Sequence, residues 1–296
     1  MIGLSIDKQK THAAIFTDGG AFVCADSCDT PTDSYRATLL AISGLVASVS
    51  ASHPDHAPIG IAIPGTFRNG TVNHSAVAHL NGKDIRQDLR AALGRDVHIS
   101  NIGDCFTYQE ARHGIAANSD SVFGMIIDVS CHGGFAIKGD ILLGTNGIAG
   151  NWAHLPLPSP VPYELEGQDC WCGRTGCLET FLSSTGVEDD YFKITETRQS
   201  AAQIATAAAN GDIVATSALQ VLEDRLGRAT AAIINIIDPD VIVLGGMVGS
   251  LERLTSNVPR KWPGYVIARR PQTKLVISEN GNMAILAGAA RLANAQ

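Results

Sequence analysis

The sequence predicts an α/β protein, and three observations support this prediction. Apolar residues make up 45% of the 296 residues and aromatic residues only 5%, with many Ala, Ile and Val. Short β-branched runs recur along the chain, as in Pro58-Ile-Gly-Ile-Ala-Ile-Pro64, where prolines bound a buried strand. Other stretches carry apolar residues at helical spacing. A chain of this length can form two domains with full hydrophobic cores.

Strands are predicted where short apolar runs lie between turn signals. Asp18-Gly-Gly20 separates two such runs near the amino terminus, and Cys131-His-Gly-Gly134 separates two more in the middle of the chain. The strand at 97–99 is expected to lead into a loop at 100–104. The expected strands are 2–6, 12–17, 21–26, 58–64, 97–99, 122–129, 135–138 and 241–244.

Helices are predicted where apolar residues repeat every three or four positions. The repeat in 33–52 places Leu39, Ile42 and Val46 on one face. A further helix is expected to begin near Phe106. The helices expected from such repeats are 33–52, 85–93, 201–210, 217–237 and 283–292.

Charge and hydropathy exclude several classes of partner. The formal net charge is −7 and the pI is about 5.7, whereas a nucleic-acid surface needs clustered Lys and Arg. No apolar run approaches the roughly 20 residues of a membrane span. The amino terminus, MIGLSIDKQK, carries charges where a signal peptide needs an apolar stretch. We therefore expect a cytoplasmic protein that binds neither nucleic acid nor a membrane.

A cluster of cysteines predicts a metal site. Cys170, Cys172 and Cys177 fall within eight residues, and His154 lies sixteen positions before the first of them. Three thiolates and one imidazole form the ligand set of a four-coordinate structural Zn²⁺, with no position left for a catalytic water. One alternative is three ordinary buried cysteines, because free Cys packs like a small hydrophobe. A disulfide is disfavoured by the odd total of seven cysteines and the missing secretory signal.

Two motifs around this cluster resemble the signature of a known family. They are Asn-Gly-x-Ala-Gly-x-x-x-His at 146–154 and Cys-x-Cys-Gly-x-x-Gly-Cys-x-Glu-Thr-Phe at 170–181. Both are similar to the signature of the ROK family of bacterial sugar kinases, repressors and relatives, above all to its fructokinase-type members. Further matching motifs occur in the family's order, so the resemblance covers nearly the whole chain. They are Ile63-Pro-Gly65, Leu80-Asn-Gly82, Ser183-Ser-Thr-Gly186 and the segment 238–246.

The resemblance implies a two-lobed actin-like ATPase fold, of the sugar kinase and Hsp70 type, with a cleft between the lobes and a structural zinc loop. We expect the N-terminal lobe at 1–107 plus 278–296, with a phosphate loop and the sugar site. The C-terminal lobe is expected at 108–277, with the zinc loop, the adenine side and the dimer contact. Relatives are commonly dimers, so a homodimer is expected. The family's repressors carry a helix-turn-helix module before this fold, whereas this chain starts on its first strand, so we expect no DNA binding.

The reaction implied by the family is ATP-dependent phosphorylation of a hexose (fructose, glucose or an N-acetylhexosamine) at a primary hydroxyl, with Mg²⁺. Such chemistry needs backbone N–H groups around the phosphates. Relatives begin Gly-x-Asp-x-Gly-Gly-Thr-Lys, but this chain reads Gly3-Leu-Ser-Ile-Asp-Lys-Gln-Lys10. Their second loop, Gly-Thr-Gly-x-Gly-x-Gly, is replaced by 128–134 here, where Asp128 adds a negative charge. The nucleotide-binding positions that the resemblance still implies are Lys10, Gly134, Gly245 and Gly246.

The general base is the sharpest departure from the family. The motif Asn-Asp-Ala-Asn-Cys aligns on residues 101–105, which places Ile102 where the catalytic aspartate should be. Isoleucine cannot accept a proton, and general-base catalysis typically contributes 10²–10⁴-fold. Asp104 lies two residues further on. A local shift of the backbone would allow Asp104 to act as the catalytic carboxylate. The alternative is that Asp104 caps the helix beginning near Phe106.

The sugar site is only partly kept. Asn81, Asn101, His154 and Glu179 match positions that the resemblance assigns to sugar binding, and Asn151 replaces a glutamate there. Asn81-Gly82 is equally a turn signal, and Glu179 is alternatively a surface or supporting group.

Two functional hypotheses follow. The first is an active ATP-dependent hexose kinase that uses a shifted carboxylate such as Asp104. The second is a pseudokinase that keeps the fold and the zinc and binds a sugar or a partner without efficient catalysis. A regulatory subunit is not separable from the second by sequence. We favour the second, because the losses fall in the phosphate loops and at the base while the packing and zinc segments survive.

Overall fold

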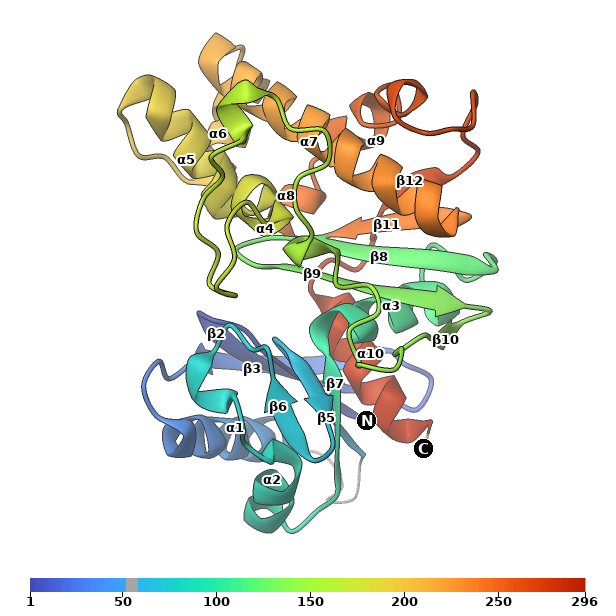
Figure 1. The fold of residues 1–296 in the computed structure, drawn as a ribbon. Coiled ribbons are helices and arrows are strands. Elements are labelled where there is room, and N and C mark those ends of the chain that lie inside the picture. Colours follow the sequence, from blue (N-terminus) through green and yellow to red (C-terminus); the bar gives the residue numbers. More distant parts are fainter. Residues whose placement is uncertain (52–57, 296) are drawn as a thin grey trace.

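The computed structural model describes residues 1–51 and 58–295 and has two lobes, each built on a five-stranded mixed sheet (Figure 1). The first sheet has the order β3 (Phe22–Asp29), β2 (Lys10–Phe16), β1 (Ile2–Ile6), β4 (Ile59–Ile63) and β7 (Val97–Asn101). The second has the order β10 (Asp140–Ile141), β9 (Cys131–Ile137), β8 (Ser121–Ile127), β11 (Val241–Gly245) and β12 (Lys274–Ile277).

The two sheets share one topology. In each, the first three strands in that order are antiparallel, and the last two run parallel to the central strand. A two-stranded ribbon, β5 (Thr66–Arg68) and β6 (Thr71–Asn73), follows β4. The repeated arrangement confirms the two-lobed actin-like fold expected from the sequence.

Helices cover both sheets, and side-chain caps fix where several of them begin. Ser34, Asp84 and Asp212 each accept a hydrogen bond from a backbone N–H in the first turn of the helix that follows. The helices are α1 (Tyr35–Ser50), α2 (Ile85–Leu93), α3 (Ile102–His113), α4 (Leu178–Leu182), α5 (Ser184–Thr195), α6 (Ala201–Ala209), α7 (Ile213–Ile237), α8 (Gly246–Gly249), α9 (Arg253–Asn257) and α10 (Met283–Asn294). Within residues 1–51 and 58–295, no helix combines the length and apolar character needed to cross a bilayer.

Helices α3 and α10 lie side by side between the two sheets (Figure 1). Helix α10 rests directly on the first sheet: a β-carbon added to Gly3 or Gly60 would lie 1.9 or 1.8 Å from one of its backbone oxygens. A β-carbon on Gly288 of α10 would lie 1.9 Å from the carbonyl oxygen of Cys105 in α3. Glycines therefore let the two helices and the sheet approach backbone to backbone.

The apolar core has a part in each lobe and a part between them. The cluster between the lobes joins α3 and α10 through residues such as Ile102, Phe106 and Ile285. The expected division of the chain at residue 107 falls inside α3, which packs on both β8 and β9. The lobe boundaries 1–107 plus 278–296 and 108–277 stay a prediction.

Two predicted stretches are wrong. The turn expected at Cys131-His-Gly-Gly134 is the first part of β9, and the chain turns at 128–130 instead. The other error is at the start of α3. We expected a loop at 100–104 and a helix near Phe106 capped by Asp104, but β7 runs to Asn101 and α3 begins at Ile102. Asn101 is the cap, because its side-chain oxygen accepts a hydrogen bond from the N–H of Gly103 at 2.6 Å. Asp104 is the third residue of the helix and has no capping role.

Other differences concern element ends and short elements. Helix α7 begins at Ile213, four residues before the predicted start, because Asp212 caps it. Helices α4 and α5 and strand β12 were not predicted, since their apolar repeats are short and mixed with polar residues.

Candidate functional site

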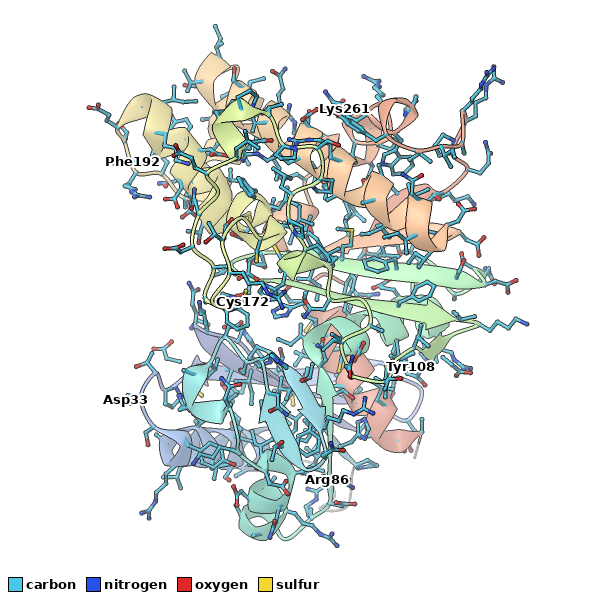
Figure 2. The ribbon with its side chains drawn as sticks, viewed as in Figure 1. Asp33, Arg86, Tyr108, Cys172, Phe192 and Lys261 are labelled. Atoms are coloured by element: carbon cyan, nitrogen blue, oxygen red, sulfur yellow. The ribbon has the colours of Figure 1, made fainter. Side chains whose placement is uncertain are left out.

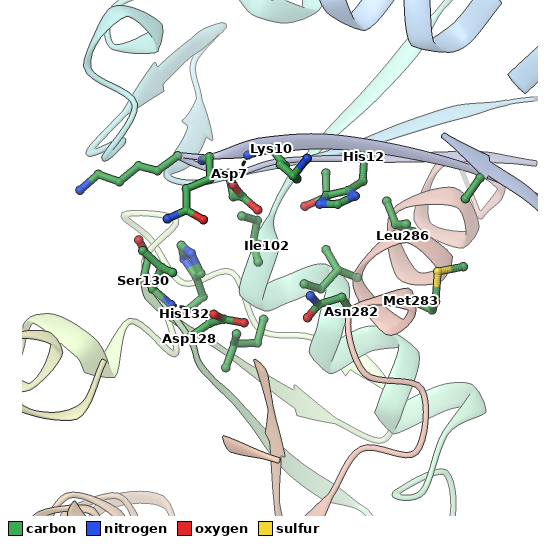
Figure 3. Close-up of a pocket in the computed structure, with 17 residues that line it drawn as sticks. Asp7, Lys10, His12, Ile102, Asp128, Ser130, His132, Asn282, Met283 and Leu286 are labelled. Atoms are coloured by element: carbon green, nitrogen blue, oxygen red, sulfur yellow. Dashed lines mark hydrogen bonds between the residues drawn. The ribbon is translucent and has the colours of Figure 1, made fainter. Parts of the chain in front are cut away.

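A cavity of about 320 Å³, here called the cleft cavity, lies between the lobes. It is bounded by the β1–β2 turn (7–10), the β8–β9 turn (128–130) and the beginnings of α3 and α10 (Figure 3). Ile102 lines it from α3, and Asn282 lines it from the residue before α10. The two turns are the segments in which the sequence analysis placed the phosphate loops.

The β1–β2 turn is closed by its own aspartate. Oδ1 of Asp7 accepts hydrogen bonds from the backbone N–H groups of Gln9 and Lys10, both at 2.7 Å (Figure 3). Lys10 lines the cleft cavity, but its Nζ lies 3.4 Å from the carboxylate of Asp29. Both side chains of that pair are exposed, so the pair contributes little to stability.

The β8–β9 turn is closed in a similar way. Oδ1 of Asp128 accepts from the N–H of Val129 at 2.8 Å, and Oδ2 accepts from the N–H of Met247 at 3.0 Å. Residue 246 must be glycine, because its φ is +81° and a β-carbon there would lie 2.5 Å from the carbonyl oxygen of Ile127. Asp128 therefore ties the end of β8 to the start of α8.

Three of the four predicted nucleotide-binding positions do not line the cleft cavity. Gly134, Gly245 and Gly246 are absent from its walls, whereas Lys10 is present. A β-carbon on Gly134 would lie 2.7 Å from the carbonyl oxygen of Gly103, and one on Gly245 would lie 2.6 Å from the ring of Phe106. Close packing against α3 explains why both positions need glycine. A role of these residues in nucleotide binding stays a prediction.

Ile102 and Asp104 lie in different surroundings. Ile102 faces the cleft cavity and is 3% exposed, among apolar neighbours that include Ile126 and Ile285. Residues two apart on a helix point about 200° apart, and Asp104 does not line the cleft cavity. Its carboxyl is buried, and this burial raises its pKa to about 7.

A second, smaller hollow of about 30 Å³ lies beside the cleft cavity, and we call it the sugar-side hollow. Asn101, Asn151 and His154, three of the five predicted sugar-binding residues, line it together. The residues Ser130 and His132 line both this hollow and the cleft cavity. The two spaces are therefore neighbours, separated by the β8–β9 turn.

The sequence analysis missed three residues of the sugar-side hollow, His74, His132 and Trp171. His132 is buried, and desolvation together with the nearby His154 lowers its pKa to about 4, so its imidazole is neutral near pH 7. The signal that could have identified His132 is its position inside the second phosphate-loop pattern, at 128–134. Nothing in the sequence pattern pointed to His74, which reaches the site from the segment after β6.

The side chains of the two remaining predicted sugar-binding residues form hydrogen bonds with other groups of the protein. The Oε2 atom of Glu179 accepts from the N–H of Cys131 at 3.1 Å, and Oε1 accepts from Nε1 of Trp171 at 2.5 Å. The side-chain amide of Asn81 accepts from the N–H of Ser75 at 2.9 Å and donates to its carbonyl oxygen at 3.0 Å. Neither residue lines the cleft cavity or the sugar-side hollow, and their sugar-binding role stays a prediction.

The four predicted metal ligands come together. The ligand atoms of His154, Cys170, Cys172 and Cys177 all lie within 4.8 Å of one another. Nδ1 of His154 is 3.5 Å from Sγ of Cys170, and the sulfurs of Cys172 and Cys177 are 3.6 Å apart. Figure 2 shows Cys172 at the tip of its loop, on the side of the second lobe that faces the first.

These separations fit a metal and exclude a disulfide. Tetrahedral zinc–thiolate bonds of about 2.3 Å place two sulfurs roughly 3.7 Å apart, whereas a disulfide bond measures about 2.05 Å. Positive φ angles at Gly173 and Gly176, of 86° and 74°, turn the loop so that the three sulfurs converge. All three cysteines are free thiols in the structure. The donor set can therefore hold one four-coordinate ion.

Comparison with known proteins agrees with these features. Two curated relatives are an N-acetyl-D-glucosamine kinase from Vibrio vulnificus, 30% identical with 98% of each chain covered, and the N-acetylgalactosamine kinase AgaK from Shewanella sp., 31% identical with 98% of this chain and 95% of the relative covered. A ROK family glucokinase from Streptomyces griseus, solved with glucose and AMPPNP, has the same fold, with a TM-score of 0.87 at 23% identity over 100% of this chain and 99% of that one. A sequence model of the ROK family matches residues 1–296. The chain therefore belongs to the ROK family.

Proposed function

We propose that this protein is a sugar-binding member of the ROK family that has lost efficient ATP-dependent phosphotransfer. The observation that carries the proposal is the position of Ile102 at the start of α3, facing the cleft cavity. A general base must lie within hydrogen-bond reach of the hydroxyl whose proton it takes. Ile102 has no atom that accepts a proton, and Asp104 is on another side of the helix, away from the cavity.

The sugar-side hollow supports retained sugar binding. Asn101, Asn151 and His154 offer donors and acceptors around a hollow of about 30 Å³, where they would bind hydroxyls of a sugar that extends in from the larger cleft cavity. The names of the two curated relatives are those of N-acetylhexosamine kinases. We therefore propose an N-acetylhexosamine as the sugar, in preference to the fructose suggested by the likeness to fructokinase-type members.

We also propose that His154, Cys170, Cys172 and Cys177 hold a structural zinc ion. Four protein ligands would complete a tetrahedral shell, so the ion would stabilise the loop and not activate a water. The same ion would fix the ring of His154, whose edge lies against Trp171 with ring centroids 4.8 Å apart. Both residues line the sugar-side hollow.

Two measurements test the function. Coupled ADP release with ATP, Mg²⁺ and N-acetylglucosamine, N-acetylgalactosamine, glucose or fructose should stay at or below about 0.01 s⁻¹, which is 100-fold under the low end of the 1–100 s⁻¹ typical of kinases. Turnover near 1 s⁻¹ would overturn the loss of phosphotransfer. In a thermal-shift titration, an N-acetylhexosamine should raise Tm, and Asn151→Ala should reduce that shift while the exposed Asn118→Ala should not. Absence of any shift with all four sugars would overturn sugar binding.

The second candidate is an active hexose kinase in which Asp104 is the base, and its raised pKa favours that role. Under this alternative, Asp104→Asn abolishes hexose-dependent ADP release. Homodimerisation is a separate proposal that follows from the family resemblance, and light scattering should give twice the chain mass of 31.1 kDa.

A further inference from the structure

Two aspartates that line the cleft cavity occupy four backbone N–H donors, three of which belong to other residues of its wall. Asp7 binds the N–H groups of Gln9 and Lys10, and Asp128 binds those of Val129 and Met247, all at 2.7–3.0 Å. Both aspartates line the cavity (Figure 3). A carboxylate and a phosphate use the same kind of donor, because each presents anionic oxygens to N–H groups.

The contact made by Asp128 joins distant parts of the chain. Asp128 and Met247 are 119 residues apart, and the glycine at 246 lets the chain pass close to the end of β8. Asp7 forms its bonds within a tight turn between two buried strands. The two carboxylates therefore sit on opposite walls of the cavity, one on each lobe.

Lys8 and Lys10 line the same cavity, but neither forms an ion pair with Asp7 or Asp128. Among the described residues, no ion pair includes Asp7 or Asp128, and the nearby Lys10 pairs with Asp29 instead. A nucleotide phosphate entering the cavity would have to displace these carboxylates from their N–H groups and remain close to their charge. An uncharged ligand meets neither obstacle. The rest of the wall includes polar residues such as His12 and the apolar Ile102 and Ile126.

We infer that Asp7 and Asp128 act as built-in anions that exclude nucleoside polyphosphates from the cleft cavity and make it selective for uncharged ligands. This inference deepens the proposed function and rests on it for the identity of the cleft. It assigns the specificity to two side chains, so removing them should restore phosphate binding.

The test is calorimetric titration of Mg-ADP and of inorganic pyrophosphate into the full chain without sugar. The wild-type protein should bind neither with a Kd below 1 mM. The Asp7→Gly/Asp128→Gly double variant should bind Mg-ADP at least tenfold more tightly than the wild type. Asp18→Gly is the matched control, because Asp18 lies in another hairpin turn and does not line the cavity, and it should behave as the wild type.

A second double variant guards against misfolding. Asp7→Asn/Asp128→Asn removes both charges but keeps one acceptor oxygen on each side chain, which is enough for both bonds of Asp7 and for one of the two bonds of Asp128. It should therefore gain a smaller factor, about threefold. Circular dichroism establishes that each variant is folded; if the glycine variant is not, the asparagine variant decides. The inference would be overturned if the wild-type protein bound Mg-ADP with a Kd below 1 mM. It would also be overturned if a folded variant bound Mg-ADP no more tightly than the wild type. These titrations contain no sugar, so a failure of sugar binding or the discovery of turnover is detected separately.

Discussion

The start of α3 touches β9 backbone to backbone at Gly103 and Gly133. A β-carbon built on Gly103 would lie 2.1 Å from the carbonyl oxygen of Gly133, much closer than any real contact allows. Both partners are backbone in regular elements, so neither can move aside easily. The helix that presents Ile102 to the cleft cavity is therefore held by close backbone contact with the second sheet.

Replacing Gly103 should reveal this contact. Gly103→Ala should lower the free energy of unfolding by about 1–3 kcal/mol, as overpacking of a tight interior does. The control is Gly44→Ala in α1, where a β-carbon would meet nothing within 4 Å. That change should raise stability by about 0.5–1 kcal/mol, because alanine favours the helix over glycine. Urea unfolding measures both, and equal stability of Gly103→Ala and the wild type would refute the tight contact.

Asp104 should make stability depend on pH. Burial raises the pKa of Asp104 to about 7 from the ordinary 3.8. Between these two pH values the carboxyl is therefore protonated in the folded state and ionised in the unfolded state. The contribution of this group to stability therefore falls as pH rises from about 4 to 7. Asp104→Asn cannot ionise, so its stability relative to the wild type should increase by roughly 3 kcal/mol between pH 5 and pH 8.

Urea unfolding at both pH values checks this difference. The exposed Asp33→Asn, on the outside of the first lobe (Figure 2), is the control and should show the same change with pH as the wild type. A constant difference between Asp104→Asn and the wild type would mean that the carboxyl is solvated in the protein.

The buried carboxylate of Glu164 should be essential for the second lobe. It accepts hydrogen bonds from Arg225 at 2.8 Å and from Arg228 at 2.9 Å, and all three side chains are at most 3% exposed. Burial alone would raise the pKa of Glu164, but the bonds from the two arginines lower it to about 2. Glu164→Ala removes the partner that Arg225 and Arg228 share and leaves them only Asp190 and Asp224, respectively. The loss should cost about 3 kcal/mol, the low end of the range for breaking a buried ion pair.

The control for Glu164 is the exposed pair of Arg198 and Asp189. Asp189→Ala should change the free energy of unfolding by less than about 1 kcal/mol. Chemical unfolding of both variants gives the comparison, and a cost for Glu164→Ala no larger than that of the control would show that the buried cluster contributes no net stability.

Zinc should be present at one ion per chain and should depend on Cys177. Metal analysis of Cys177→Ser should show loss of zinc, and its Tm should fall by at least about 5 °C, because metal binding free energy is folding free energy. Cys28→Ser is the matched control, since Cys28 lies on β3, outside the cluster, and it should retain both zinc and Tm. The assignment of a structural zinc would be contradicted if wild-type protein without zinc had the same Tm as wild-type protein with zinc.

Much of the fold could be predicted from the sequence, because its signals are local. Buried strands such as β4 and β11 are short β-branched runs between turn residues, and α2 matches its predicted range of 85–93. Element ends were less predictable, because they depend on caps. Asn101 and Asp212 each begin a helix earlier than the apolar repeat suggested.

The metal ligands and the surface of the cleft differ in how far the sequence determines them. His154 and the three cysteines lie within 24 residues, and glycine turns bring them together, so the motif alone identifies the cluster. Which of Ile102 and Asp104 faces the cavity depends on where α3 begins and on its contact with Gly133, a residue from another strand. The bond between Asp128 and Met247 likewise spans 119 residues. Only the tertiary structure decides such relationships, because the direction of a side chain is fixed by packing partners that are distant in the chain.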